Sequence, residues 1–244
     1  MGINILITGP AHSGTRLLVD LFKNNKNFYL PKNKLNSVNE FNKLHKYFIE
    51  CADNTDLNSE DWEIDKTKLF NILDEYYYDN INLKITNTVL KMPYYPLRCI
   101  DYFQDYFKKN LVVLYAHKKF EQIYKSHSKR NEVNKYMNNT IEMNRQLKKV
   151  NVIDRLKYIQ SKRTDKDKLN FFYDIYKFIE NFKTKNNFIK NYIINTESLE
   201  SLKKDFYFFI ETEKLTNIDL EQNLKIFGTD KSLMARLKSI FVYK

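Results

Sequence analysis

Short apolar runs recur along the chain at lengths expected of buried strands. Residues Ile3–Thr8 are Ile and Leu apart from Asn4 and the final Thr, and Gly9 ends the run. Leu111–Ala116, with the sequence LVVLYA, is the clearest of these runs. Apolar runs of this length are typical of strands buried on both faces of a sheet. On the same grounds we predict three further strands, at Asn27–Leu30, Thr88–Met92 and Tyr192–Asn195.

The segments between these strands place apolar residues at helical spacing, as Leu17, Leu18 and Leu21 do. The predicted helices are Thr15–Lys26, Val38–Cys51, Asp65–Tyr78, Leu97–Lys108, one from about Phe120, a mostly helical stretch from Glu132 to Lys185 broken near Arg163–Asp165, and helices after Asn195. Strands alternating with long helices predict a three-layer α/β fold, in which helices cover both faces of a central parallel sheet. Because no linker-like segment or repeat divides the chain, residues 1–244 are predicted to form a single domain.

Composition supports a folded chain and adds a strong positive charge. Hydrophobic residues make up 43% of the chain and aromatic residues 15%, which excludes a disordered protein. The net charge is +11, but the basic residues are spread thinly along the chain. Such a charge favours an anionic partner, such as a nucleotide, a nucleic acid, a membrane surface or an acidic sugar. A Lys- and Asn-rich composition inherited from AT-rich coding explains the same net charge, so both interpretations remain open.

The chain shows no signal for secretion or membrane insertion. Its two cysteines, Cys51 and Cys99, form neither a disulfide framework nor a CxxC metal pattern, which indicates a reducing compartment. No apolar run approaches the roughly 20 residues that span a bilayer. The N-terminus lacks the basic segment of a signal peptide, and Leu6 stands where a myristoylation motif after Gly2 needs Ser or Thr. We therefore expect a soluble, cytoplasmic protein.

The junction after the first predicted strand carries the most specific chemistry. It reads GPAHSGTR, residues 9–16, and it holds two of the four glycines of the whole chain. Glycines let backbone N–H groups turn inward around an anion, and the following helix start adds positive charge. The alternative is a tight strand-to-helix turn without a ligand. The loop departs from the Walker A pattern, because Thr15 and Arg16 occupy its Lys and Ser/Thr positions.

These residues resemble the 5′-phosphosulfate loop of sulfotransferases that use 3′-phosphoadenosine-5′-phosphosulfate (PAPS). That loop has a glycine four positions before a Ser-Gly-Thr sequence and a cation directly before the Ser. The resemblance implies a P-loop-like sulfotransferase fold and a co-substrate site made by Ser13, Gly14, Thr15 and Arg16. It also places His12 where the family has Lys or Arg.

A second junction resembles the family's 3′-phosphate anchor. In the family a strand ends in an Arg, and a Ser follows eight residues later. Lys118 and Ser126 have that spacing here, with Phe120 in place of the family's Pro. The resemblance implies that both hold the 3′-phosphate, although a lysine lacks the bidentate fork of an arginine. The alternative is a solvated lysine pair and a surface serine.

Three more segments follow the family's order along the chain. They are residues 89–103, 191–210 and 234–244, whereas residues 132–185 match nothing specific. Within the first, Lys91 falls where the family places a lysine near the transferred group. An exposed lysine at a strand end is the alternative.

The resemblance implies in-line sulfuryl transfer without a metal. Lys91, His12 and Arg16 would stabilise the leaving 5′-phosphate. Glu40 is the predicted general base, although Ser37 and Glu40 also fit a helix capping box, and His45 is the alternative base. The acceptor is a glycan, a small alcohol or phenol, or a tyrosine, and the excess positive charge favours an acidic glycan.

Two other functions compete with this one. A P-loop kinase would need a loop lysine and a carboxylate for Mg²⁺, and neither is evident in the sequence. A nucleic-acid-binding protein would need a clustered basic face with aromatic residues on a sheet. The aromatic residues here lie at helical spacing instead, which a hydrophobic core explains.

Overall fold

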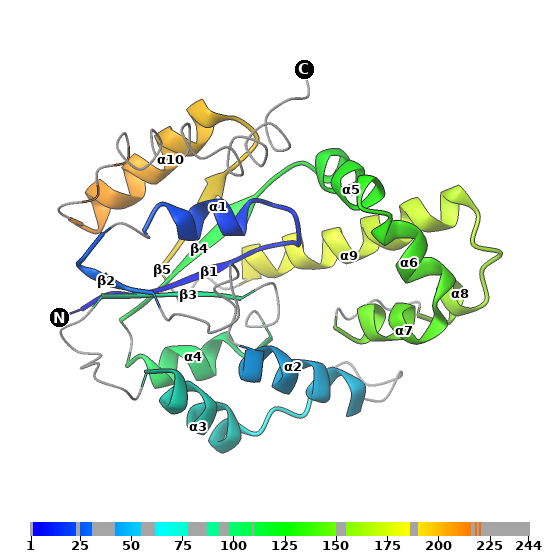
Figure 1. The fold of residues 1–244 in the computed structure, drawn as a ribbon, viewed down its shortest axis with the longest axis horizontal. Coiled ribbons are helices and arrows are strands. Elements are labelled where there is room, and N and C mark those ends of the chain that lie inside the picture. The colour runs from blue at the N-terminus through cyan, green and yellow to red at the C-terminus, as the bar shows by residue number, and fades with distance from the viewer. Residues whose placement is uncertain are drawn as a thin grey trace.

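The protein is an α/β fold built on a five-stranded parallel sheet (Figure 1). The computed structural model describes residues 2–22, 25–30, 42–54, 62–77, 87–92, 98–108, 110–149, 155–185, 190–215, 218 and 220. The strands are β1 (Asn4–Thr8), β2 (Phe28–Tyr29), β3 (Asn87–Lys91), β4 (Leu111–His117) and β5 (Lys190–Asn195). Their order across the sheet is β2-β3-β1-β4-β5, so β1 lies at the centre.

Helices of the described residues follow the predicted segments closely. They are α1 (Thr15–Asp20), α2 (Asn42–Asn54), α3 (Lys66–Tyr77), α4 (Ile100–Tyr106), α5 (Phe120–Lys129), α6 (Glu132–Asn138), α7 (Thr140–Lys149), α8 (Arg155–Ile159), α9 (Asp165–Lys185) and α10 (Leu199–Thr212). The predicted break near Arg163 is confirmed: this residue has a φ of 58° between α8 and α9. Helix α1 is shorter than predicted, because the chain leaves it in a turn at Leu21.

Helices cover both faces of the sheet, as Figure 1 shows. One face packs on α1 and α10 through a core that includes Ile7, Leu114 and Phe206. The opposite face packs on α2, α3 and α4 through a core that includes Leu90, Phe48 and Phe103. The three-layer α/β class predicted from the alternation of elements is therefore confirmed.

Helices α5 to α9 form a third hydrophobic cluster at the carboxyl ends of the strands. Tyr115 of β4 packs there with buried residues of α6, α7 and α9, including Met137, Leu147 and Phe171. Because all five strands are parallel, the loops after β1, β3, β4 and β5 emerge at the same edge. This is the edge at which sheets of this kind bind ligands. None of the described helices combines the length and the apolar character needed to cross a bilayer.

Candidate functional site

The loop after β1 can form only because glycine stands at two of its positions. Gly9 has a φ of 144° and Gly14 a φ of 95°, values that side-chain-bearing residues rarely adopt. A Cβ on Gly9 would lie 2.7 Å from the carbonyl oxygen of Ala116 in β4. A Cβ on Gly14 would lie 2.9 Å from Oγ1 of Thr196, just after β5. Both glycines are therefore required by neighbouring strand ends that close on the loop.

This loop also holds hydrogen-bond donors that the described part of the chain does not use. The side chain of Ser13 is fully buried, and its hydroxyl has no partner. Within the described ranges the amides of Gly14, Thr15 and Arg16 donate to no carbonyl, and the first helical bond runs from Leu18 to Gly14. A buried unpaired hydroxyl costs free energy, so it indicates a place for a ligand. Backbone amides that donate to no carbonyl at the start of a helix suit an anion.

Thr196 connects the loop after β1 to the ends of β4 and β5. Its hydroxyl is buried and lies 2.5 Å from the carbonyl oxygen of Ser13 and 3.0 Å from that of His117. Its amide donates to the same His117 carbonyl at 2.9 Å. The position of the loop is therefore fixed by β4 and β5 as well as by β1.

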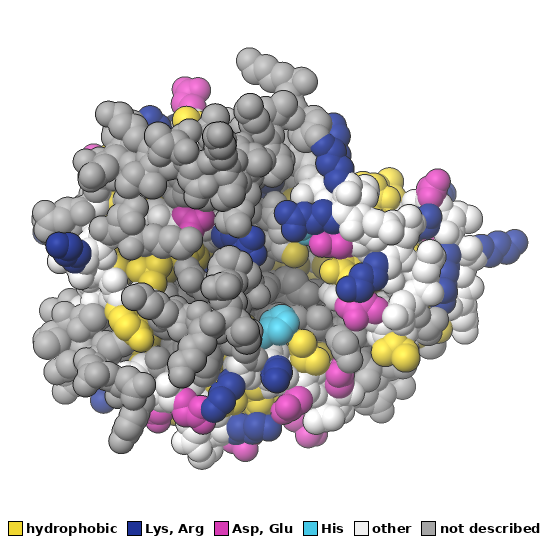
Figure 2. All heavy atoms as spheres, in the orientation of Figure 1, with side chains coloured by type: hydrophobic (Ala, Val, Ile, Leu, Met, Phe, Trp, Pro, Cys, Tyr) yellow, Lys and Arg dark blue, Asp and Glu magenta, His cyan; other side chains and the backbone are white. Residues whose placement is uncertain are grey.

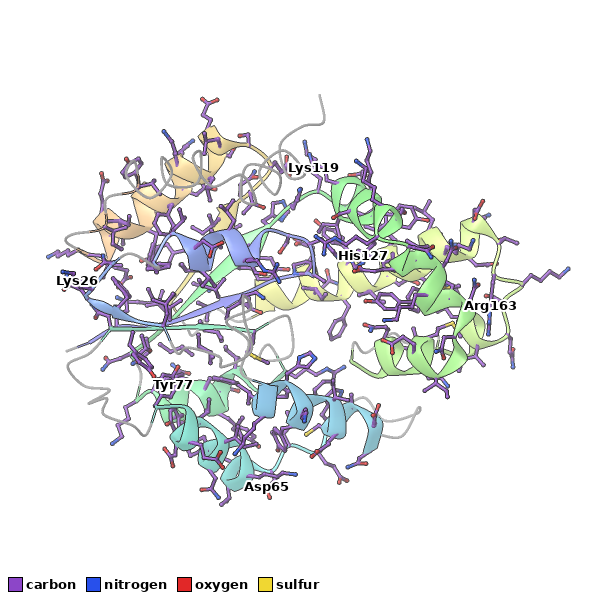
Figure 3. The ribbon with its side chains drawn as sticks, in the orientation of Figure 1. Lys26, Asp65, Tyr77, Lys119, His127 and Arg163 are labelled. Carbon is purple, nitrogen blue, oxygen red and sulfur yellow. The ribbon has the colours of Figure 1, made fainter. Side chains whose placement is uncertain are left out.

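His12 connects the loop to α5 and α6. Its backbone has a φ of 66°, and its Nε2 lies 2.7 Å from Oε2 of Glu132, the first residue of α6. Its Nδ1 lies 3.2 Å from Oγ of Ser126 on α5. His127, labelled beside α6 in Figure 3, places Nδ1 2.7 Å from the same Glu132 oxygen. The rings of the two histidines meet edge to face at 4.2 Å.

These contacts affect the protonation of Glu132 and His127. Burial alone raises the pKa of Glu132, but the hydrogen bonds from His12 and His127 outweigh it and hold that pKa well below its usual range. Glu132 is therefore a carboxylate. Burial lowers the pKa of His127, and the neighbouring carboxylate only partly offsets this. The protonated form of His127 is thus less favoured than that of an exposed histidine.

Lys91 ends the strand next to β1. The register pairs it with Ile7, two positions before Gly9, and only 5% of the residue is exposed. The alternative of an exposed strand-end lysine is therefore wrong. A buried lysine in the strand next to β1 suits an anionic ligand at this edge of the sheet.

Lys118 follows β4 directly and is also buried, with 4% exposed. Burial lowers its pKa below the ordinary lysine value, while the charge of Glu197 acts in the opposite direction. Glu197 itself lies 3.3 Å from Nζ of Lys119 and 3.9 Å from Nε2 of His117. Lys118 is therefore not the solvated lysine of the alternative interpretation.

The predicted site residues meet at one edge of the sheet, as far as the described residues extend. Ser126 contacts His12, and Lys91 and Lys118 lie at the ends of the two strands beside β1. Arg16 is partly exposed in the first turn of α1 and forms no ion pair in the described ranges. Glu40, its capping partner Ser37 and residues 234–244 lie outside the described residues, so these predictions stay untested.

Three residues of the site escaped the sequence analysis. His127 adjoins Ser126 but has no metal or catalytic motif, and Glu132 reaches the loop only because α6 turns back on α5. Thr196 follows the last strand, so a search for polar residues at strand ends would have found it.

Basic residues do not gather into one field on the face that Figure 2 shows. The described Lys and Arg side chains there are interspersed with Asp and Glu. Comparisons of the chain with protein-family models, curated proteins and solved structures find no match. The case for a function therefore rests on the chemistry of the site.

Proposed function

We propose that the protein is a sulfotransferase that moves the sulfuryl group of PAPS to a hydroxyl acceptor. The loop of residues 9–16 would hold the 5′-phosphosulfate through Ser13 and the amides of Gly14, Thr15 and Arg16. Lys118 and Ser126 would hold the 3′-phosphate. The unpaired buried hydroxyl of Ser13 and the loop amides that donate to no backbone carbonyl of the described residues support this assignment.

One observation carries the choice of sulfuryl over phosphoryl transfer. Among the described residues, β1 and both of its neighbours end without a carboxylate, in Thr8, Lys91 and the pair His117–Lys118. The segment after β3, residues 93–97, contains none either. In P-loop enzymes the carboxylate that holds Mg²⁺ stands at the end of a strand beside the phosphate loop. Glu132, which does reach the loop, comes from α6 and is bound to His12 and His127 instead. Buried lysines at the strand ends suit a reaction in which side chains neutralise the leaving group.

In the proposed reaction the acceptor oxygen attacks sulfur in line with the bond to the 5′-phosphate. A new S–O bond forms as the bond between sulfur and the 5′-phosphate oxygen breaks, and PAP leaves with the electron pair. Lys91, Arg16 and His12 would stabilise the charge on that leaving oxygen. The acceptor proton passes to a general base, for which Glu40 remains the proposed residue, with His45 as the alternative.

A thermal-shift panel tests this function. A ligand at about 100 times its Kd stabilises the folded state by about 2.7 kcal/mol, which is a shift of about 5–10 °C for a chain of this size. PAP should produce this shift without Mg²⁺, and AMP a much smaller one. Equal shifts from PAP and AMP would contradict the 3′-phosphate assignment. A shift from ATP that requires Mg²⁺ would favour a kinase instead.

A further inference from the structure

A group of three metal-ligating side chains lies beside the phosphate loop. His12 comes from the loop itself, His127 from the last turn of α5 and Glu132 from the first turn of α6. One ligand atom of each lies within 4.8 Å of the other two. The residues are 115 and 5 positions apart along the chain, so only the fold brings them together.

The spacing of their atoms is close to that of a metal site. Both histidine nitrogens lie 2.7 Å from the same carboxylate oxygen. In a tetrahedral zinc site with bonds of about 2.1 Å, neighbouring ligand atoms are about 3.4 Å apart. Each histidine nitrogen would therefore need to move about 0.7 Å away from the Glu132 oxygen to admit the ion, which side-chain rotation allows.

The ligand set selects a class of ion. Two imidazoles and one carboxylate suit Zn²⁺ and similar first-row ions, and they disfavour Mg²⁺ and Ca²⁺, which prefer oxygen ligands. Three protein ligands leave a fourth position for water or a ligand oxygen. The side chains are only partly exposed, at 12% for His12 and 24% for Glu132, so an ion could enter yet be shielded from bulk water.

Neighbouring groups hold the ligands in place. Ser126 Oγ lies 3.2 Å from Nδ1 of His12, where it can accept the N–H of a ring that binds metal through Nε2. Phe172 packs on the His127 ring at 4.8 Å. Asn131, directly before Glu132, has a φ of 57°, and His12 a φ of 66°. Such backbone persists only where the surroundings enforce it.

We propose that His12, His127 and Glu132 bind one Zn²⁺ ion, or a closely related transition-metal ion, that fastens the phosphate loop to α5 and α6. With the ion bound, His12 would act on an anion in the loop through the metal and not through its own ring, and the ion would supply a fixed positive charge next to a loop that lacks the Walker lysine. The site does not depend on sulfuryl transfer, because a phosphate loop of any enzyme could be fastened in this way.

Calorimetric titration of the full, chelator-treated chain with ZnCl₂ tests the proposal. We expect one ion per chain, and Co²⁺ at the same site should give the intense visible absorption of a four-coordinate ion. Glu132→Gln keeps the size of the side chain and can still hydrogen-bond, but it removes the anionic ligand. It should weaken Zn²⁺ binding by more than about 100-fold, because the loss of an outer-shell partner alone costs about 10- to 100-fold.

Glu197→Gln is the matched control, because Glu197 is also half-buried beside a histidine, at 3.9 Å from His117, but lies outside the group. It should bind Zn²⁺ like the wild type. Circular dichroism checks that both variants are folded. His127→Gln provides a second ligand variant if Glu132→Gln does not fold. Failure of the wild type to bind a stoichiometric ion would overturn the proposal. Equal Zn²⁺ affinities of the wild type, Glu132→Gln and His127→Gln would also overturn it.

Discussion

At the scale of single residues, Gly9 shows why the loop after β1 tolerates so little change. Gly9→Ala would combine an unfavourable φ of 144° with a Cβ placed 2.7 Å from the Ala116 carbonyl oxygen. That oxygen belongs to β4, which is hydrogen-bonded on both sides and cannot move aside. We expect a loss of at least about 2 kcal/mol, which is a fall in Tm of at least about 4–8 °C.

Ala11→Gly is the control for this variant, because Ala11 is exposed in the same loop. It should change Tm by less than about 3 °C, since exposed positions contribute little. A Gly9→Ala variant with the same Tm as the wild type would mean that the loop does not have this conformation.

Lys118 predicts a pH dependence at the same scale. Burial lowers its pKa below the ordinary lysine value, so it loses its charge at lower pH than an exposed lysine does. The unfolded chain binds this proton more tightly than the folded one. The free energy of unfolding should therefore rise with pH between the lowered pKa and about 10.4, as the cost of a buried charge disappears.

Nucleotide binding should change in the opposite direction over the same window. PAP affinity should fall as Lys118 loses its charge, whereas Lys118→Arg stays charged and should keep its affinity. Titrations with PAP from neutral to alkaline pH check this. Parallel pH profiles for the wild type and Lys118→Arg would show that Lys118 does not bind PAP.

At the scale of elements, Thr196 couples the end of β5 to the loop after β1. Thr196→Val keeps the shape of the side chain but leaves the carbonyls of Ser13 and His117 without this donor. We expect a loss of about 1–3 kcal/mol in urea unfolding and weaker PAP binding. Thr196→Ser retains the hydroxyl and should recover most of both. If valine and serine behave alike, the hydroxyl does not hold the loop.

The elements were largely predictable from the sequence, and the site was predictable in part. Runs such as Leu111–Ala116 identify strands because burial on both faces demands continuous apolar residues. The loop was identified by two glycines in a glycine-poor chain. Glu132 could not be predicted, because its contact with His12 spans 120 positions and depends on how α6 turns back on α5. The burial of Lys91 and Lys118 likewise depends on the neighbouring strands and helices.

At the scale of the whole molecule, the two cysteines report on the core between the sheet and α2, α3 and α4. Cys51 of α2 and Cys99 before α4 are 6% and 5% exposed in the same cluster, and burial raises the pKa of both thiols. A thiol reagent should therefore label neither in the native protein, and both in urea. The labelling rate should follow the unfolding transition. Rapid labelling of either thiol in native buffer would show that this layer is loosely packed.

The most direct test of the central claim compares PAP and AMP on the wild type and on Lys118→Ala. These ligands differ only in the 3′-phosphate, and Lys118 is the charged group proposed to hold it. A charge-assisted hydrogen bond of about 1.5–3 kcal/mol predicts a roughly 10- to 100-fold loss of PAP affinity in the variant. AMP affinity should change less than about threefold, which also shows that the variant is folded. Equal losses for PAP and AMP, or no loss for either, would contradict the assignment of a PAPS site to this edge of the sheet.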